Sequence, residues 1–216
     1  MKWGLPCRCR RGFTLVELLV VTVVIGVLLS LLLPTLSRAK ERARIAKVQA
    51  ELYGVGLALE MYADDHAGRL PPVRINCNTD LYDHWCQFPV ELADLGYLPR
   101  DRRPGMAVGM EDVFNPGHTY KYATPGPQLV NDVPGGDFKL WVPEDFPAGR
   151  GTNGVWESGA DTSRIRWVVW SLGPRPNSAR SQSGKAPLAP GSWYRPGGGG
   201  VILRAASRDG PQWQFP

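Results

Sequence analysis

Glu17 is the residue whose type and position most clearly suggest chemistry, because it lies inside the one apolar segment long enough to cross a membrane. From Phe13 to Leu36 no other side chain is ionisable. At about 1.5 Å per residue, a helix of this length spans a hydrocarbon core of roughly 30 Å. A carboxylate there costs about 2.5–3.5 kcal/mol at mid-membrane, and less near the interface. We therefore expect Glu17 to be functional and to be neutralised by a positive group of another copy of the chain.

The segment ahead of the apolar run is short and basic. It contains Lys2, Arg8, Arg10 and Arg11 and no acidic residue. Basic residues beside a span stay in the cytoplasm, so the chain after Leu36 is expected on the far side of the membrane. Four of the 25 basic residues lie here, which leaves 21 against 20 acidic residues in the remainder. The composition therefore gives no support to a general nucleic-acid-binding surface.

The same segment carries a motif. Residues 10–17, Arg-Arg-Gly-Phe-Thr-Leu-Val-Glu, followed by the apolar run, resemble the class III leader of type IV pilins and type II secretion pseudopilins. The resemblance implies cleavage after Gly12 by a prepilin peptidase and N-methylation of the new terminus at Phe13. It also implies that Glu17, fifth residue of the mature chain, pairs with the Phe13 amine of a neighbouring subunit. Pro34 falls where this family usually carries a proline.

Two other classes of N-terminal segment share the apolar run. A secretory signal peptide has a shorter apolar core and small residues at its cleavage site, whereas Leu33–Arg38 offers bulky ones. An uncleaved signal anchor explains the run but not Glu17. It would make the protein a signal-anchored periplasmic binding module, with the aromatic-rich remainder as its working part.

Beyond the membrane segment, the sequence predicts that the helix continues to about Ala63 and is amphipathic. Its apolar residues follow spacings of three and four, at Ile45, Val48, Leu52, Val55, Leu59 and Tyr62. Pro34 is expected to kink the helix because it lacks a backbone N–H. Gly54 and Gly56 indicate that a sheet approaches the helix closely.

The rest of the sequence predicts a short helix at 89–95. It also predicts four strands, at 119–123, 138–142, 164–171 and 201–205. One long helix followed by a small antiparallel β-sheet head with long loops is an α+β fold, and it is also the pilin-like plan. The expected divisions are a cytoplasmic leader (1–12), a transmembrane and assembly helix (13–36), its amphipathic continuation (37–63) and a periplasmic globular head (64–216).

Patches of the head resemble major type II secretion pseudopilins. They are Leu81–Pro99, Asp112–Gly126 and Trp170–Pro174. In those proteins the loop after the "SLG" strand end commonly holds Ca²⁺. Here Arg175 stands where an acidic residue would be expected, and positive charge disfavours a divalent cation that requires carboxylate oxygens. No cofactor is therefore expected.

The two cysteines of the head allow two kinds of site. Cys77 and Cys86 would lie in an oxidising compartment if the head is periplasmic, and a disulfide between them would contribute about 2–3 kcal/mol. The alternative is a metal site built from Cys77, His84 and Cys86. That spacing matches no common zinc pattern and shows no obvious fourth ligand, so we predict the disulfide.

No enzyme is predicted. The three histidines, His66, His84 and His118, belong to no triad, zinc or phosphate motif. Of the many tryptophans, Trp141, Trp167 and Trp170 are expected in the core, because they lie on predicted strands. Trp193, Trp213 and Tyr194 lie in Gly/Pro-rich sequence, where an exposed aromatic patch for a glycan or protein is the alternative to core packing.

The sequence thus predicts a structural filament subunit. The resemblance favours a pseudopilin of a type II protein secretion system, with a type IV pilin for adhesion, motility or DNA uptake as the alternative. The implied partners are further copies, other pseudopilins, the prepilin peptidase and the inner-membrane secretion platform. The precursor would be a single-pass inner-membrane protein with a cytoplasmic N-terminus and a periplasmic head. The mature form would lie in a periplasmic or surface filament.

Overall fold

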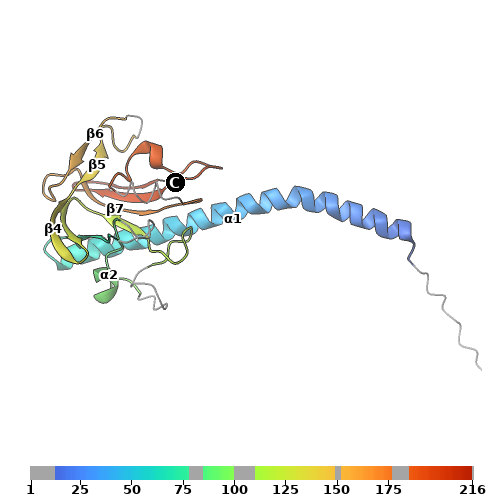
Figure 1. Cartoon of the computed structure of the whole chain (residues 1–216), viewed down its shortest axis with the longest axis horizontal. Helices are drawn as coiled ribbons and strands as arrows, with labels where there is room; N and C mark the ends of the chain where they lie inside the picture. Colours follow the sequence, from blue (N-terminus) through green and yellow to red (C-terminus); the bar gives the residue numbers. More distant parts are fainter. Residues whose placement is uncertain (1–12, 78–84, 100–109, 149–151, 177–184, 216) are drawn as a thin grey trace, which may run out of the picture. The chain divides into compact units, whose positions relative to one another are not determined.

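The computed structural model describes residues 13–77, 85–99, 110–148, 152–176 and 185–215 (Figure 1). The chain divides into two compact units, residues 1–42 and 43–216. The long helix α1, Leu15–Asp65, contributes to both. Its end lies within two residues of the predicted one, because the Asp-Asp-His-Ala-Gly sequence that follows favours a turn.

In the first unit, every described residue from Phe13 to Lys40 is exposed. Three hydroxyl-bearing residues of the helix interior form hydrogen bonds within the helix. Thr22, Ser30 and Thr35 each donate their hydroxyl to the carbonyl three residues earlier, at 2.9, 2.7 and 2.7 Å. Such bonds keep polar groups satisfied where no water is available. Pro34 lies inside α1 and does not end it.

In the second unit, the predicted apolar stripe of α1 is confirmed. Val48, Leu52, Val55 and Leu59 are fully buried, and Ile45 and Tyr62 are partly buried against the same core. Helix spacing places these residues on one side of α1, where they pack with strand residues such as Trp167 and Val169. The stripe therefore anchors this part of the helix to the head.

The described part of the head contains three sheets. The first comprises β1 (Val73–Ile75), β3 (Gly126–Val130) and β4 (Val133–Phe138), and β1 runs parallel to β3. The second is antiparallel in the order β2 (Lys121–Ala123), β7 (Ile165–Ser171), β8 (Ile202–Ser207) and β9 (Gln212–Phe215). The third pairs β5 (Leu140–Pro143) with β6 (Gly154–Glu157). The helix α2 (Glu91–Asp94) and a 3₁₀ turn at Pro190–Ser192 complete the elements. The α+β prediction holds, although the sheets are not wholly antiparallel.

The predicted strand at 138–142 is wrong, because two strands meet there. Phe138 ends β4 and pairs with Gly126, whereas Leu140 begins β5 and pairs with Glu157. Both side chains are buried, so their alternation looked like one strand. The β3–β4 hairpin was not predicted from the sequence. Its turn is Asn131-Asp132, both at positive φ (48° and 64°), and such residues are typical of two-residue hairpin loops.

The tryptophans follow the expected core packing except at Trp141. Trp167 and Trp170 are buried as predicted, but Trp141 is only half-buried. Trp193 and Trp213 are half-buried and pack against the core, where Trp193 stacks on Phe215 at 4.5 Å between ring centroids. These aromatics therefore extend the core rather than form an exposed patch.

The two glycines of the amphipathic helix make a matched pair for mutation. A Cβ on Gly56 would lie 2.7 Å from Cη2 of the buried Trp167, whereas a Cβ on Gly54 meets nothing within 4 Å. The predicted close approach of a sheet is therefore confirmed at Gly56, and the same prediction is wrong at Gly54. Alanine at either position gains about 1 kcal/mol of helix propensity, but at Gly56 overpacking costs about 1–3 kcal/mol.

We therefore expect Gly54→Ala to raise the melting temperature and to exceed Gly56→Ala in stability by about 1–3 kcal/mol. Chemical denaturation of both variants, followed by tryptophan fluorescence, measures this difference. Equal stabilities would mean that the helix and β7 lie farther apart than in the structure.

Candidate assembly and processing site

The first turn of α1 is closed by Thr14 and Glu17. The Thr14 backbone N–H and hydroxyl both donate to Oε2 of Glu17 at 2.8 Å, and the Glu17 N–H donates to the Thr14 hydroxyl oxygen at 3.2 Å. This reciprocal pair is a capping box, which satisfies backbone donors that a helix start otherwise leaves unpaired. The Thr-x-x-Glu spacing is the sequence signal of this capping box, but Glu17 was interpreted only as an assembly residue.

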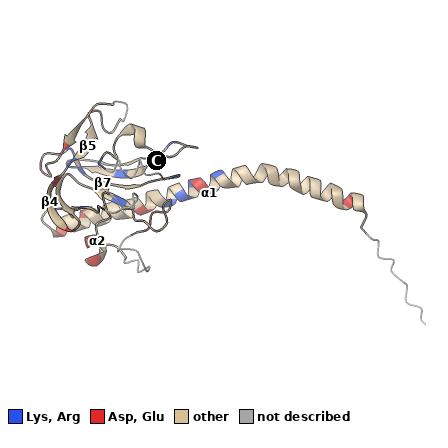
Figure 2. Cartoon of the chain, in the orientation of Figure 1, with Lys and Arg blue, Asp and Glu red and all other residues tan. Residues whose placement is uncertain are grey.

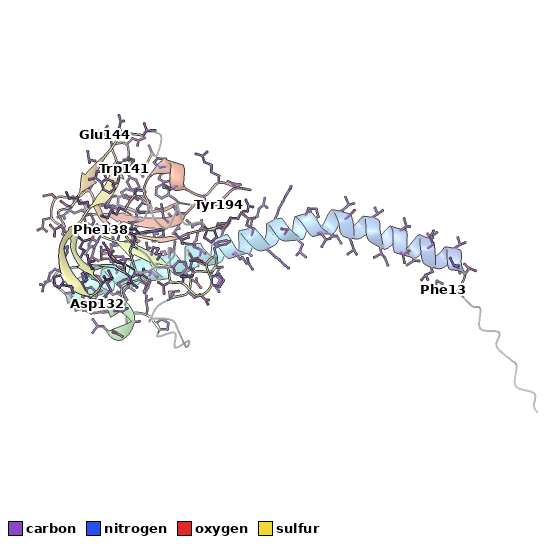
Figure 3. The ribbon with its side chains drawn as sticks, viewed as in Figure 1. Phe13, Asp132, Phe138, Trp141, Glu144 and Tyr194 are labelled. Carbon is purple, nitrogen blue, oxygen red and sulfur yellow. The ribbon has the colours of Figure 1, made fainter. Side chains whose placement is uncertain are left out.

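The capping box uses only one carboxylate oxygen. Both bonds from Thr14 go to Oε2, and Oε1 of Glu17 accepts no hydrogen bond from any residue that the structure describes. Phe13 precedes the box and is 80% exposed (Figure 3). The turn therefore presents one unused anionic oxygen close to the predicted new N-terminus. Gly12, on the other side of the predicted cleavage point, lies outside the described residues.

No other charge accompanies Glu17 in the apolar segment. Figure 2 shows α1 without Lys, Arg, Asp or Glu from the residue after Glu17 until a cluster of basic residues that begins at Arg38. One helix of the described chain, α1, is long and apolar enough to cross a membrane. A carboxylate in that setting needs a partner, and among the residues that the structure describes its hydrogen-bond donors are both on Thr14.

Acidic residues of the second half of α1 bind the head instead. Glu51 accepts a hydrogen bond from the hydroxyl of Tyr120, and Glu60 accepts bonds from the Arg166 guanidinium and, at 2.7 Å, from the Trp167 indole. Burial raises the pKa of the Tyr120 phenol far above its usual value, and the bond to Glu51 raises it further. These acids thus fix the helix to the sheet, a role that their spacing alone did not predict.

The buried carboxylate of Asp112 accepts hydrogen bonds from the end of β7 and from the residue after it. Asp112 is 1% exposed, and it accepts bonds from the Ser171 hydroxyl at 2.7 Å and from the backbone N–H groups of Leu172 and Phe114 at 3.0 Å. Burial raises the pKa of Asp112, while its hydrogen bonds oppose that shift. The "SLG" segment is therefore held in place by a residue 59 positions earlier, which is why sequence periodicity could not reveal the contact.

Arg175 lies directly after this segment, and its side chain forms hydrogen bonds that hold the head together. Its φ is +55°, and its Nη1 donates to the backbone carbonyls of Gly197 at 2.7 Å and Gly198 at 3.1 Å. A cationic group thus contacts carbonyl oxygens of the Gly-rich loop. Within the described ranges, no group of three or more His, Cys, Asp or Glu could hold a metal ion.

Cys77 and Cys86 are both thiols in the structure, so the predicted disulfide is not formed. Cys77 is exposed, whereas Cys86 lies fully buried in the core cluster. Burial raises the pKa of the Cys86 thiol to about 12, so the thiolate that forms disulfides is scarce there. His84, the third member of the alternative metal set, lies outside the described residues.

Residues 7–33 match the family described as the prokaryotic N-terminal methylation motif. This range contains the Phe13–Glu17 turn and most of the apolar segment. This match supports the resemblance of the N-terminal segment to type IV pilins and pseudopilins. The N-terminal helix and the motif are consistent with membrane anchoring, as in the predicted pilin-like plan.

Three proteins that are similar to this chain are named "Type II secretion system core protein G". The protein of Escherichia coli K12 is 39% identical over 88 residues, which cover 34% of this chain and 61% of the relative. Those of Klebsiella pneumoniae and Pectobacterium carotovorum are 47% and 44% identical over 58 and 57 residues, covering 27% and 26% of this chain and 41% and 36% of the relatives. The chain thus spans less than two thirds of the length of each of these relatives. No solved structure was found to match it.

Proposed function

We propose that this chain is a pseudopilin of a type II protein secretion system. The observation that carries the role as a filament subunit is the first turn of α1, where Glu17 keeps Oε1 available beside Phe13. The names of the relatives support secretion over a surface fibre. A type IV pilin would use the same turn, so the head and its genomic setting must distinguish the two.

The proposed mechanism begins with the precursor in the inner membrane. Cleavage after Gly12 creates a positive amine at Phe13, and the helix then leaves the bilayer to pack in the filament. Oε1 of Glu17 neutralises the amine of a neighbouring copy, while Oε2 keeps its bonds to Thr14. Burying either charge without the other would cost about 3–5 kcal/mol, which makes assembly depend on the pair.

Deletion of the gene in its native host tests the proposal. A pseudopilin predicts that exported proteins accumulate in the periplasm and that plasmid-borne wild type restores their release. Normal export combined with lost twitching motility or DNA uptake would instead assign the chain to a type IV pilus. Unchanged export and unchanged surface fibres would favour the signal-anchored binding module.

We also propose that the segment after β7 needs no calcium for its folded structure, because Arg175 supplies the cationic contact to the Gly197 and Gly198 carbonyls. The melting temperature of the wild type is then expected to be the same in millimolar CaCl₂ and in excess EDTA. Arg175→Ala is expected to lower stability by about 1–2 kcal/mol, since it removes charged hydrogen bonds at an exposed site. A rise of several degrees on adding calcium to the wild type would refute the proposal.

A further inference from the structure

The strand pair β5–β6 carries two tryptophans that the core does not use. Trp156 is 54% exposed and Trp141 is half-buried, and neither belongs to the core cluster or to the side chains packed against it. The other described tryptophans all belong to one of these two groups, namely Trp85, Trp167, Trp170, Trp193 and Trp213. Single exposed apolar residues are common on protein surfaces, but two adjacent tryptophans outside the core indicate a binding surface.

The strand register places both indoles on the same face. Trp141 on β5 is the direct partner of Trp156 on β6, and the side chains of such partners point to the same side of the sheet. Leu140 and Val142, the neighbours of Trp141 along β5, are fully buried. Because successive side chains of a strand alternate, the face that carries the two tryptophans points away from the core.

Gly154 allows the Trp141 indole to lie across this face. Gly154 is two residues before Trp156 on β6, and a Cβ on it would overlap Cζ2 and Cε2 of Trp141. The Trp141 ring therefore reaches diagonally over the neighbouring strand and lies against its backbone, a position from which any other residue at 154 would displace it. We call this aromatic surface the indole platform and define it as Trp141, Gly154 and Trp156.

The indole platform is uncharged. The one ionisable residue of β5 and β6 is Glu157, whose strand partner is the buried Leu140, so its side chain points to the opposite face. There its carboxylate accepts hydrogen bonds from the Ser163 hydroxyl at 2.6 Å and from Nε of Arg164 at 2.7 Å. A phosphate or carboxylate ligand would require Lys or Arg on the platform. The platform is therefore suited to an uncharged ligand.

The size of the indole platform favours a small ligand over a folded protein. A tryptophan side chain offers at most about 250 Å², so two partly exposed ones present on the order of 200 Å². A stable protein–protein interface buries about 800 Å² on each partner. The platform thus matches a ligand of a few linked rings, whereas a protein would need contacts that two strands of four residues do not supply.

We propose that the indole platform binds a neutral oligosaccharide by stacking its sugar rings on Trp141 and Trp156. One side of a hexose ring exposes several weakly positive C–H groups, and the face of an indole is electron-rich. Thr152 and Asn153 are exposed and directly precede Gly154, where they supply a hydroxyl and an amide for the sugar hydroxyls. In Figure 1, β5 and β6 lie on the side of the head away from α1, so sugar binding does not compete with contacts of that helix.

Two substitutions on one strand test the platform. The full chain, in a detergent without a sugar headgroup, is titrated with the hexamer of N-acetylglucosamine and with cellohexaose, and binding is followed by isothermal titration calorimetry. We expect saturable binding of at least one hexamer and at least a tenfold loss of affinity in Trp156→Ala. Val155→Ala is the control, expected within about twofold of wild type, because Val155 is 45% exposed but pairs with Val142 on the opposite face.

A second measurement uses the wild type alone. The bound hexamer should protect Trp156 from oxidation by N-bromosuccinimide and leave the oxidation of the partly exposed Trp213 unchanged, as read by peptide mass spectrometry. This keeps the proposal testable if Trp156→Ala fails to fold.

Three results would overturn the proposal. They are no binding of either hexamer at millimolar concentration, equal losses of affinity in the two variants, and a crosslink in cells from p-benzoylphenylalanine at position 156 to one defined protein. The filament function stands or falls separately, because sugar binding by the isolated chain requires no assembly.

Discussion

Glu17→Gln is expected to abolish filament formation while leaving the first turn of α1 intact. The glutamine amide oxygen can still accept the bonds from Thr14, because glutamine also serves at this position of a capping box. It cannot neutralise the Phe13 amine of a neighbour. Loss of one member of a buried pair costs about 3–5 kcal/mol, which corresponds to two or more orders of magnitude in assembly. Immunoblots of sheared filaments, normalised to the membrane fraction, measure the effect.

Thr14→Ala is the matched control, because it removes the side-chain half of the capping box and keeps the charge. It is expected to weaken the helix start by about 0.5–2 kcal/mol and to leave filaments abundant. The opposite pattern, with Thr14→Ala deficient and Glu17→Gln assembling normally, would mean that Glu17 serves only as a helix cap. The pairing role would then be refuted, although the fold would stand.

Gly173→Ala is expected to destabilise the head strongly. Gly173 has a φ of +68°, and a Cβ there would overlap the carbonyl oxygen of Gly200. The left-handed conformation costs an alanine about 1–2 kcal/mol, and the overlap with backbone adds roughly 1–3 kcal/mol. For a domain of this size, a fall of roughly 5–15 °C in Tm is expected. Differential scanning fluorimetry of the detergent-solubilised chain measures it.

Gly197→Ala separates the two causes. Gly197 has a similar φ of +77°, but a Cβ there meets nothing within 4 Å. Only the conformational cost of about 1–2 kcal/mol should remain. If both variants lost the same stability, the packing of the β7 end against the Gly-rich loop would differ from the structure. The comparison thus tests a contact between segments that lie far apart in the sequence.

Features encoded within a few residues were predictable. The helix, its end near Ala63 and the buried stripe from Val48 to Leu59 follow from local spacing and turn chemistry. The strands β1, β3 and β4 could not be predicted from local spacing. Their sequences are short or rich in Gly and Pro, and β1 pairs in parallel with β3 more than 50 residues later. Pairing over such distances leaves no periodic trace in either strand.

The candidate site divides in the same way. Glu17 and Phe13 were identified from residue type and order. The capping box gives Glu17 a second, structural role, which was not predicted because Glu17 was interpreted only as an assembly residue. Asp112 was noticed only within a resembling patch, because its partner Ser171 lies 59 residues away. The disulfide was inferred from the spacing of Cys77 and Cys86 and from the expected oxidising compartment, and neither reveals that Cys86 is buried.

The mass of the mature N-terminus tests the account most directly. The protein is purified from cells that contain a prepilin peptidase, and its N-terminal peptide is identified by mass spectrometry. The account predicts a chain that begins at Phe13 and carries one methyl group on its amine. A chain that retains Met1, or one cut near Ser37, would contradict it, because Glu17 would then have no freed amine to neutralise.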